Sequence, residues 1–596
     1  MPVFANDCGD EMYRRYNPDE CSNNVTDSQD SKLSFATTAA IGGGALAVVA
    51  GTVALLSKSS SDTEKNSNAQ PTLQTYNMVG SDIDSAHLSS IIYESEYTRN
   101  FNEYNDIRLA YSLARGFTGK NSTIAVLDSG KNTWHGKNVA HLSSGHIAPD
   151  ATVKSYQISD IYDNFVSYDE IANTIRSAND ANIYNFSWSS SLLATQIKNR
   201  RDIERITSTH FINTLTDVAQ NNDAIFVWAA GNDFSAQSSA LSSIPLHVSE
   251  LNGHIVNVVA WDSETGKLAT FSNACGITKD YCITAPGANI DSPVSSDPLN
   301  GTSFAAPIVS AAIAVIREAF PYMKSTEITK LLFTTARDLG ETGIDKIYGH
   351  GMLDLEAATR PVGATLVPIS DKMTVSLNTA RVSAPIGHGI KSKNLKFSFI
   401  DSFGRAFDTQ MNNNIKIKNR GIGMDHIRDT NLNVAEFKNI TFGFRNSNLL
   451  SGAGFLQTEN NNQTQFIGIS DEFEFGNNTI FFNASIGHSA PKAPTESIIT
   501  KFSDIYSTTA TFGIKHGDFK LSISMPETII NGNMYLHTPS GRANNGEYIF
   551  QDYKIDISGN PSFEYNITYK NMTMGFVDNA YGTDEIYFVS KHKIAF

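Results

Sequence analysis

The stretch Asn300–Ile316 reads NGTSFAAPIVSAAIAVI and starts a helix that is apolar on every side. Such a helix is typical of the centre of a protein, because none of its faces is suited to water. Ser303 stands at the mouth of this helix, where free N–H groups and the positive end of the helix dipole favour a developing negative charge. Ser303 is therefore a candidate nucleophile, and a structural N-cap serine is the alternative interpretation.

The segments before this helix alternate between short apolar runs and helical periods. We expect strands at 123–127, 153–158, 182–188 and 224–229, and helices at 169–179, 211–220 and 302–320, with a further helix from Ser325. Strands separated by helices of about ten residues are typical of βαβ units and a parallel sheet. The fold predicted for this region is a three-layer α/β domain.

Three further polar residues follow predicted strands or begin predicted helices. Asp128 ends a strand in IAVLDSG, His135 precedes a glycine in WHGKNVAHLSSG, and Asn232 follows a strand in VWAAGND. The carboxyl ends of parallel strands meet at one edge of the sheet, where reactive groups collect. Each residue alone has an ordinary explanation, for example a turn for the Gly231–Asn232 pair.

The combination of these residues predicts nucleophilic catalysis. A serine hydroxyl needs a base, and the base needs a carboxylate that holds its tautomer. Asp128, His135 and Ser303 supply these groups in the chain order Asp, His, Ser, and Asn232 supplies an amide that could donate to an oxyanion. His141 and His146 remain competing candidates for the base. An esterase with a G-x-S-x-G turn is not favoured, because Ser303 lacks the second glycine.

These motifs resemble the active-site motifs of subtilases, and the resemblance covers about Glu94–Gly363. It implies a subtilisin-like domain that cleaves peptide bonds through an acyl-enzyme. It also implies that NFSWS, with Asn185, Ser187, Trp188 and Ser189, pairs with the substrate backbone, and that Ala229, Ala230 and Gly231 complete the primary specificity pocket. The stretches 94–122, 275–287 and 348–363 are similar to those of subtilase autotransporters of Gram-negative bacteria.

The chain departs from the subtilase pattern at two positions. His135 lies only seven positions after Asp128, so the usual surface loop between them is nearly absent. The family sequence HGTHVAG reads HGKNVAH here, and Asn138 replaces the second histidine. A catalytically inactive subtilase-like protein that binds or anchors at a surface is therefore the alternative function.

Composition narrows the choice of partners. The net charge of −15 argues against nucleic acid, and polypeptide substrates are the expected partners. The motifs require no cofactor, and neither a C-x-x-C motif nor a histidine-rich cluster indicates a metal site. The four cysteines form two close pairs, Cys8 with Cys21 and Cys275 with Cys282, which suggests disulfides and an oxidising compartment.

The chain divides by composition into six regions. They are a tail at 1–34, an uncharged apolar segment at 35–56 that is long enough to span a bilayer, a polar linker at 57–92, the peptidase domain at 93–363, a β-rich connection at 364–438 and a β domain at 439–596. Short alternating runs predict antiparallel all-β structure after Pro361. For 439–596 the choice lies between an autotransporter-like outer-membrane barrel and a soluble β-sandwich. The expected location is the bacterial cell envelope, at the outer membrane or cell surface.

Overall fold

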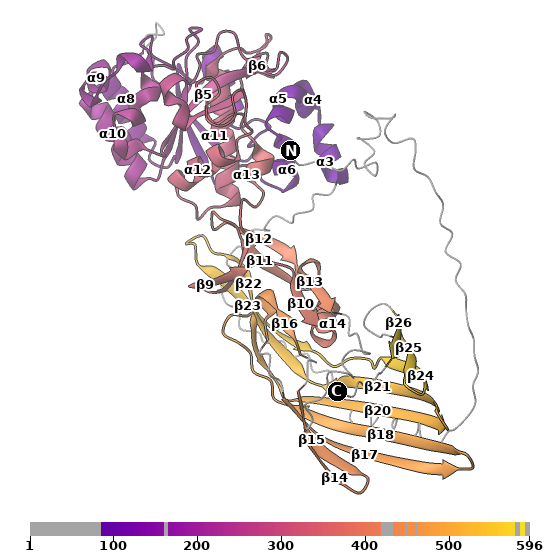
Figure 1. Cartoon of the computed structure of the whole chain (residues 1–596). Helices are drawn as coiled ribbons and strands as arrows, with labels where there is room; N and C mark the ends of the chain where they lie inside the picture. Colours follow the sequence, from indigo (N-terminus) through magenta and orange to yellow (C-terminus); the bar gives the residue numbers. More distant parts are fainter. Residues whose placement is uncertain are drawn as a thin grey trace, which may run out of the picture. The chain divides into compact units, whose positions relative to one another are not determined.

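The structure is a computed structural model (Figure 1) that describes residues 85–159, 165–418, 433–446, 450–458, 463–578 and 584–590. The predicted apolar segment 35–56 and the Cys8–Cys21 pair lie outside these residues. The last eight residues of the predicted linker form helix α3 (Ser85–Ile92), in which Ile91 is buried and Leu88 and Ile92 pack against the core of the α/β domain. Apolar burial therefore begins before residue 93.

A seven-stranded sheet forms the centre of the first domain, and its path runs β2-β1-β3-β4-β5-β6, with β7 also paired to β5. Every pair is parallel except β5–β6. The sheet confirms the predicted α/β class, and the sequence prediction missed β5, β6 and β7. The strands are β1 (Thr123–Asp128), β2 (Thr152–Gln157), β3 (Ile183–Phe186), β4 (Ile225–Ala229), β5 (Ile255–Asp262), β6 (Lys267–Leu268) and β7 (Cys282–Pro286).

Alternate residues of each strand enter two different cores, which makes the domain three layers thick. In β1, Ile124 and Val126 belong to the core beneath α7, α11 and α12, whereas Ala125 and Leu127 belong to the core beneath α8 and α10. This is the period-two alternation of a strand that is covered on both faces. The helices are α4 (Ser95–Arg99), α5 (Phe101–Asp106), α6 (Leu109–Ala114), α7 (Trp134–Leu142), α8 (Tyr168–Ser177), α9 (Arg200–Ile206), α10 (Thr209–Asn221), α11 (Thr302–Ala319), α12 (Ser325–Thr335) and α13 (Leu355–Ala358).

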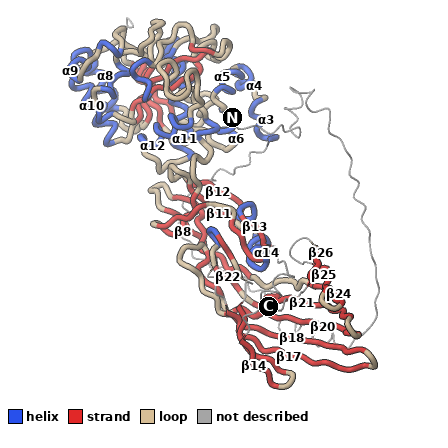
Figure 2. Tube along the Cα trace, viewed as in Figure 1, coloured by secondary structure: helices blue, strands red, loops and turns tan. Residues whose placement is uncertain are grey.

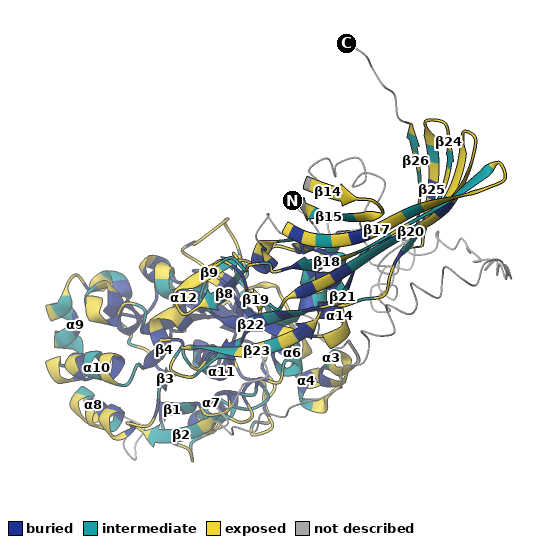
Figure 3. Ribbon diagram, turned by 90° about the horizontal axis from the view of Figure 1, so that it is seen from below, coloured by how far each residue is buried: buried dark blue, intermediate teal, exposed yellow. Residues whose placement is uncertain are grey.

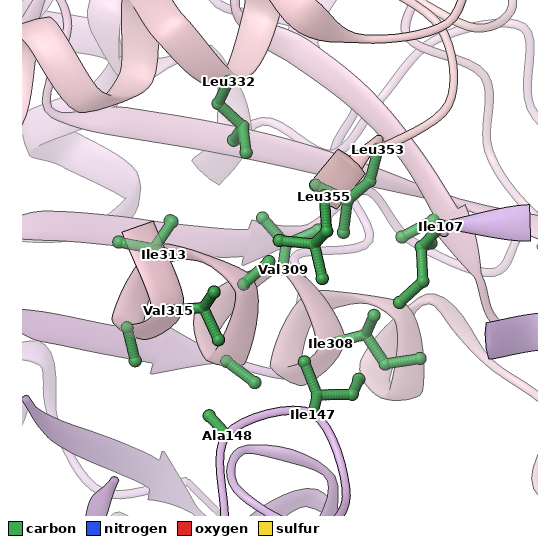
Figure 4. Packing of buried hydrophobic residues seen from close by; sticks show 14 of the residues in the cluster. Ile107, Ile147, Ala148, Ile308, Val309, Ile313, Val315, Leu332, Leu353 and Leu355 are labelled. Atoms are coloured by element: carbon green, nitrogen blue, oxygen red, sulfur yellow. The ribbon is translucent and has the colours of Figure 1, made fainter. Parts of the chain in front are cut away.

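Helix α11 is the apolar helix predicted from 302–320, and it lies inside the first core. Ile308, Val309, Ile313 and Val315 are fully buried and contact residues from several other elements, as Figure 4 shows. It is the one helix in the described residues that is long and apolar enough to cross a membrane, and 83% of it is buried in the protein. Its length and apolar composition are those of a core helix.

Most of the C-terminal region that the structure describes is strand, as Figure 2 shows. Its sheets are antiparallel, as predicted, with a single parallel pair, β10–β13, among the described strands. One helix, α14 (Ala384–Lys393), interrupts it. Ser383 and Pro385 were the signal for a helix start that the sequence analysis missed. The strands outside the largest sheet are β8 (Leu366–Ser370), β9 (Met373–Ser376), β10 (Ala380–Ser383), β11 (Lys396–Ile400), β12 (Ala406–Gln410), β13 (Ile415–Lys418), β16 (Gly452–Ala453), β19 (Ile499–Phe502), β22 (Asn533–Arg542) and β23 (Tyr548–Asp556).

The largest sheet has nine strands, and every neighbouring pair is antiparallel. Its central strands β17, β18, β20 and β21 have 12 or 13 residues, and the outer ones are shorter. In path order the strands are β14 (Asn433–Phe437), β15 (Ile440–Asn446), β17 (Gln463–Phe475), β18 (Asn478–Ser489), β20 (Ile505–His516), β21 (Phe519–Asn531), β24 (Phe563–Tyr569), β25 (Met572–Asp578) and β26 (Glu585–Ser590).

One face of this nine-stranded sheet is apolar and open. The register places one row of six side chains across six strands, and these are Phe482, Phe512, Ile523, Tyr565, Phe576 and Ile586. Many apolar side chains of this face are more than a third exposed (Figure 3), including Phe442, Ile467, Phe512, Ile567, Phe576 and Phe588. The opposite face carries small and polar residues in register, including Thr441, Gly468, Ser485 and Thr509.

A buried ion pair joins the end of the peptidase domain to the strands that follow it. Asp401 and Arg405 are both inaccessible to solvent, and the Arg405 Nη2 donates to Asp401 Oδ2 at 2.7 Å. Arg405 Nε donates to the same Asp401 oxygen at 2.9 Å, whereas Nη1 and Nη2 also reach the carbonyls of Ala358 and Arg360, respectively. The guanidinium lies 4.6 Å from the centroid of the Phe320 ring. Burial lowers the pKa of Arg405, and the charge of Asp401 opposes that change.

We predict that Arg405→Ala lowers the free energy of unfolding by about 3–5 kcal/mol, because it leaves Asp401 buried without its counter-charge. Denaturant unfolding of the purified chain measures this. The matched control is Arg360→Ala, which removes an ion pair with Glu356 whose arginine is 60% exposed and should cost about 1 kcal/mol or less. Equal effects of the two variants would contradict the assignment of the Asp401–Arg405 pair as a structural link.

Candidate active site

The predicted site residues come together at one edge of the parallel sheet. Asp128 is the last residue of β1, Ser187 follows β3, and Asn232 follows β4. Strands β1, β3 and β4 are consecutive and parallel, so their carboxyl ends lie side by side. Ser303 is the second residue of α11, which packs against these strands.

Asp128 and His135 are hydrogen-bonded to each other. His135 Nδ1 lies 2.8 Å from Asp128 Oδ1, and the aspartate side chain is nearly buried whereas that of the histidine is 34% exposed. The same carboxylate oxygen accepts from the backbone N–H and the hydroxyl of Ser129 at 2.7 and 3.0 Å. The carboxylate is therefore fixed, and it favours the tautomer in which Nδ1 carries the proton and Nε2 is free to act as a base.

The loop between β1 and α7 is short, and the side chain of Thr133 holds its two ends together. Thr133 is the N-cap of α7: its hydroxyl donates to the Gly130 carbonyl at 2.8 Å and accepts from the Gly136 N–H at 3.0 Å. A side chain at Gly136 would bring its Cβ to 2.2 Å from the Gly130 carbonyl oxygen. Five residues thus suffice to carry the chain from Asp128 to α7, and the glycine after His135 is required by this close approach.

The two competing histidines face other partners. His141 Nε2 lies 3.7 Å from a carboxylate oxygen of Glu96, and His146 stacks on Tyr104 with ring centroids 5.6 Å apart. Burial lowers the pKa of His141, with the charge of Glu96 acting in the opposite direction. Their contacts are with the helices α4 and α5 rather than with Asp128, so the geometry favours His135 over both.

Asn232 is held by the residue that precedes Ser303. Its Oδ1 accepts from the backbone N–H and from the hydroxyl of Thr302, both at 2.9 Å. The Thr302 hydroxyl in turn accepts from the Gly231 N–H at 3.2 Å. With its oxygen committed, the amide of Asn232 turns its Nδ2 donor to the other side, next to Gly301, where a Cβ atom would lie 3.6 Å from this nitrogen.

Ser303 is positioned through its backbone. The Ser187 hydroxyl donates to the Ser303 carbonyl at 2.7 Å, and Asn185 Nδ2 donates to the Ser187 hydroxyl at 2.8 Å. The next side chain, Phe304, lies with its ring centroid 5.4 Å from that of His135. Among the described residues we find no hydrogen bond between Ser303 Oγ and His135 Nε2, and such bonds are often long until substrate binds.

The residues expected to bind substrate occupy different environments. Asn185 and Ser187 are buried, and their side chains hold α11 rather than face an open surface. Trp188 is nearly buried and donates from Nε1 to the Leu127 carbonyl at 3.1 Å. Ser189 is exposed, and Ala229, Ala230 and Gly231 are buried at the end of β4. The substrate-binding role of this set stays a prediction.

Asn138, which departs from the family pattern, is fully buried and bridges two segments. Its Nδ2 donates to the Trp134 carbonyl at 2.8 Å, and its Oδ1 accepts from the Ser292 hydroxyl at 2.6 Å. Sequence reasoning missed this role, and it also missed Thr302 as the partner of Asn232. The signal for Thr302 was its place between Gly301 and Ser303 in the motif itself.

Cys275 and Cys282 are joined by a disulfide that closes the turn η4 (Gly276–Tyr281). The bridge is buried, and Asn257 Nδ2 lies 3.3 Å from the Cys282 sulfur. No group of three or more His, Cys, Asp or Glu side chains that could hold a metal ion occurs in the part of the chain that the structure describes.

Comparison with known proteins adds to this geometry. The sequence model of the subtilase family matches residues 121–351. The chain is 37% identical over 150 residues to serotype-specific antigen 1 of Mannheimia haemolytica, 30% over 167 residues to the Neisserial autotransporter lipoprotein NalP of Neisseria meningitidis, and 32% over 174 residues to an extracellular serine protease of Serratia marcescens. These alignments cover 24%, 26% and 25% of this chain.

The same alignments cover only 16%, 15% and 16% of the three relatives, so the chain spans about one sixth of their length. The matched region nevertheless contains the three-layer fold and all four predicted site residues. Residues 121–351 therefore form a domain of the subtilase family.

Proposed function

We propose that the chain is a serine endopeptidase that cleaves peptide bonds through an acyl-enzyme on Ser303. The observation that carries the proposal is the hydrogen bond of 2.8 Å between His135 and Asp128, at the sheet edge where α11 begins. A base held by a buried carboxylate next to a serine at a helix N-terminus is the arrangement that nucleophilic acyl transfer needs.

In the first step His135 Nε2 takes the proton of Ser303 Oγ as that oxygen attacks the carbonyl carbon of the substrate. Asp128 keeps the proton on Nδ1 and stabilises the imidazolium that forms. The imidazolium then gives its proton to the leaving amine, the C–N bond breaks, and the acyl group stays on Ser303. Water, deprotonated by the same nitrogen, attacks the ester carbonyl. The bond from the acyl carbon to Ser303 Oγ then breaks, the imidazolium returns its proton to that oxygen, and the acid leaves.

The negative charge on the substrate oxygen needs donors that are in place before the reaction. Asn232 Nδ2 is one, because Thr302 holds the amide in one orientation. The backbone N–H of Ser303 is the other, since the first four N–H groups of a helix have no partner within it. The dipole of α11 favours the same charge.

The alternative, an inactive protein that binds or anchors, has less support. Such a protein has no need to keep in one site a buried carboxylate, a histidine bonded to it, an oriented amide and a serine at a helix N-terminus. In this chain the hydrogen bonds of Asp128, Thr302 and Ser187 hold three of these groups or their neighbours in place. Polypeptides are therefore the proposed substrates.

We predict that Ser303→Ala abolishes both peptide hydrolysis and labelling by a serine-directed fluorophosphonate probe while the fold is kept. Removal of the nucleophile leaves no oxygen to form the covalent adduct. Labelling followed on a gel, with circular dichroism as the test of folding, measures this. The control is Ser177→Ala, which removes an exposed hydroxyl on α8 and should leave labelling intact. Labelling that persists in Ser303→Ala would refute the nucleophile and the proposed function.

We predict that Asn232→Ala lowers kcat by about 10²–10³ with little change in KM, because the amide acts on the charge that exists only in the transition state. Steady-state kinetics on a peptide substrate measure both constants. Thr302→Val is the graded companion, since it removes one of the two bonds that orient the amide and should cause a smaller loss in kcat. A rise in KM alone would assign Asn232 to a turn.

We further propose that the chain works at the cell envelope and that the apolar face of the nine-stranded sheet contacts lipid. A row of apolar side chains six strands wide, with polar residues on the opposite face, is the pattern of strands that face a bilayer. Strands β17, β18, β20 and β21 have 12 or 13 residues, which exceeds the roughly 9–11 needed to cross a bilayer. The relatives include an autotransporter lipoprotein and an extracellular protease.

We predict that Leu521→Asp weakens binding of the full chain to phospholipid vesicles by about tenfold, because it places a charge on the lipid side. Flotation of the chain with vesicles measures this. Ser522→Asp is the matched control: it adds the same charge one residue along β21, on the opposite face, and should leave binding unchanged. A wild-type chain that stays unbound, or equal losses in the two variants, would contradict the lipid contact and would leave the peptidase proposal standing.

A further inference from the structure

An exposed tryptophan borders the site immediately before the base. Trp134 is 53% exposed, although its ring is held on two sides. It meets the Phe304 ring edge-on with centroids 6.0 Å apart, and its Nε1 donates to the Ser295 hydroxyl at 3.3 Å. Val294, next to Ser295, is also exposed at 47%. Trp134 therefore offers a large apolar surface to water in a fixed orientation.

The loop that carries Ser295 is itself anchored. Asn100 exchanges two hydrogen bonds with the backbone of Asp291, at 2.9 and 2.8 Å. The Ser292 hydroxyl donates to Asn138, and Asn138 donates to the Trp134 carbonyl. The buried amide of Asn138 thus ties the loop to the backbone of Trp134 itself. An aromatic side chain whose position is set before binding loses little entropy when it contacts a ligand.

The proposed mechanism indicates which substrate residue lies next to Trp134. The base that takes the proton of Ser303 must hand it to the leaving amine, so the residue after the scissile bond lies over His135 Nε2. Trp134 adjoins His135 in the chain, and both rings rest on Phe304, the side chain after the nucleophile. The apolar surface of Trp134 is therefore on the leaving-group side of the site.

We propose that Trp134 is a specificity-determining residue for the substrate residue that follows the scissile bond, and that it selects a large apolar side chain there. The inference rests on the proposed peptidase function and adds a substrate preference to it. Acidic side chains are disfavoured at this position, because the loop that carries Ser295 also carries the exposed carboxylate of Asp297, which repels a second negative charge. The Ser295 hydroxyl donates to the backbone carbonyl of Asp297 and so holds the two residues together.

Competition for the acyl-enzyme tests the preference separately from acylation. The wild-type chain is acylated with a peptide methyl ester, and leucinamide or aspartic acid amide is added. The amine attacks the ester carbonyl, the new C–N bond replaces the bond to Ser303 Oγ, and His135 passes the amine's proton to that oxygen. The ratio of aminolysis to hydrolysis then reports how well each amide binds on the leaving-group side.

We expect the wild-type chain to favour leucinamide over aspartic acid amide by at least about tenfold, since apolar pocket contacts are worth 10–200-fold. Trp134→Ala should lower this selectivity about tenfold, and Trp134→Phe, which keeps a ring but not the bond to Ser295, should fall between. Leu246→Ala removes a similarly exposed apolar side chain from η2 (Leu241–Leu246) and should leave the ratio unchanged.

The outcomes separate the two proposals. If the wild type forms an acyl-enzyme but Trp134→Ala keeps the full selectivity, the assignment of Trp134 is wrong and the peptidase proposal stands. If the wild type forms no acyl-enzyme, the peptidase proposal fails and the preference fails with it.

Discussion

The burial of α11 between the parallel sheet and its covering helices is the constraint on which the site depends. A helix that is apolar all round cannot turn a face to water, so it lies where strands and helices contact it on every side. Its N-terminus must then emerge at the edge where β1, β3 and β4 end. Two hydrogen bonds hold the start of α11 at the ends of β4 and β3. One joins Thr302 to Asn232, and the other joins Ser187 to the Ser303 carbonyl.

The other half of the site depends on a short connection. The cap formed by Thr133 folds the chain back so quickly that a carboxylate and an imidazole seven residues apart in sequence meet at hydrogen-bond distance. His135, the proposed base, is thereby attached to α7, which packs on α11 in the same core. The helices that carry the proposed base and the proposed nucleophile thus pack on each other, as preorganised catalysis requires.

Sequence alone could predict the three-layer domain and could indicate the four candidate site residues, because both depend on local patterns. Alternation in 123–127 and 224–229 locates strands, and strand ends locate Asp128 and Asn232. It could not predict the bonding of Asn138 to Ser292 or of Thr302 to Asn232, since these pairs join residues 154 and 70 positions apart. The β5 strand was missed although it is buried along almost its whole length, and α14 was missed because its start lies among strand-like residues. The continuous apolar face of the large sheet emerges only from cross-strand register, because single strands such as β26 look irregular by themselves.

Strand direction alternates across that sheet, so an odd or an even number of strands decides whether its two outer strands point the same way. Nine strands in which each neighbour reverses the last leave the first and the last, β14 and β26, pointing the same way. If β14 and β26 of one chain paired with each other, the pair would be parallel. Two chains related by a two-fold axis could instead pair β14 with β14, or β26 with β26, and these pairs would be antiparallel. Among the described residues, the odd number of strands therefore makes the two outer strands of the sheet unlike partners for each other and suitable partners for their own copies.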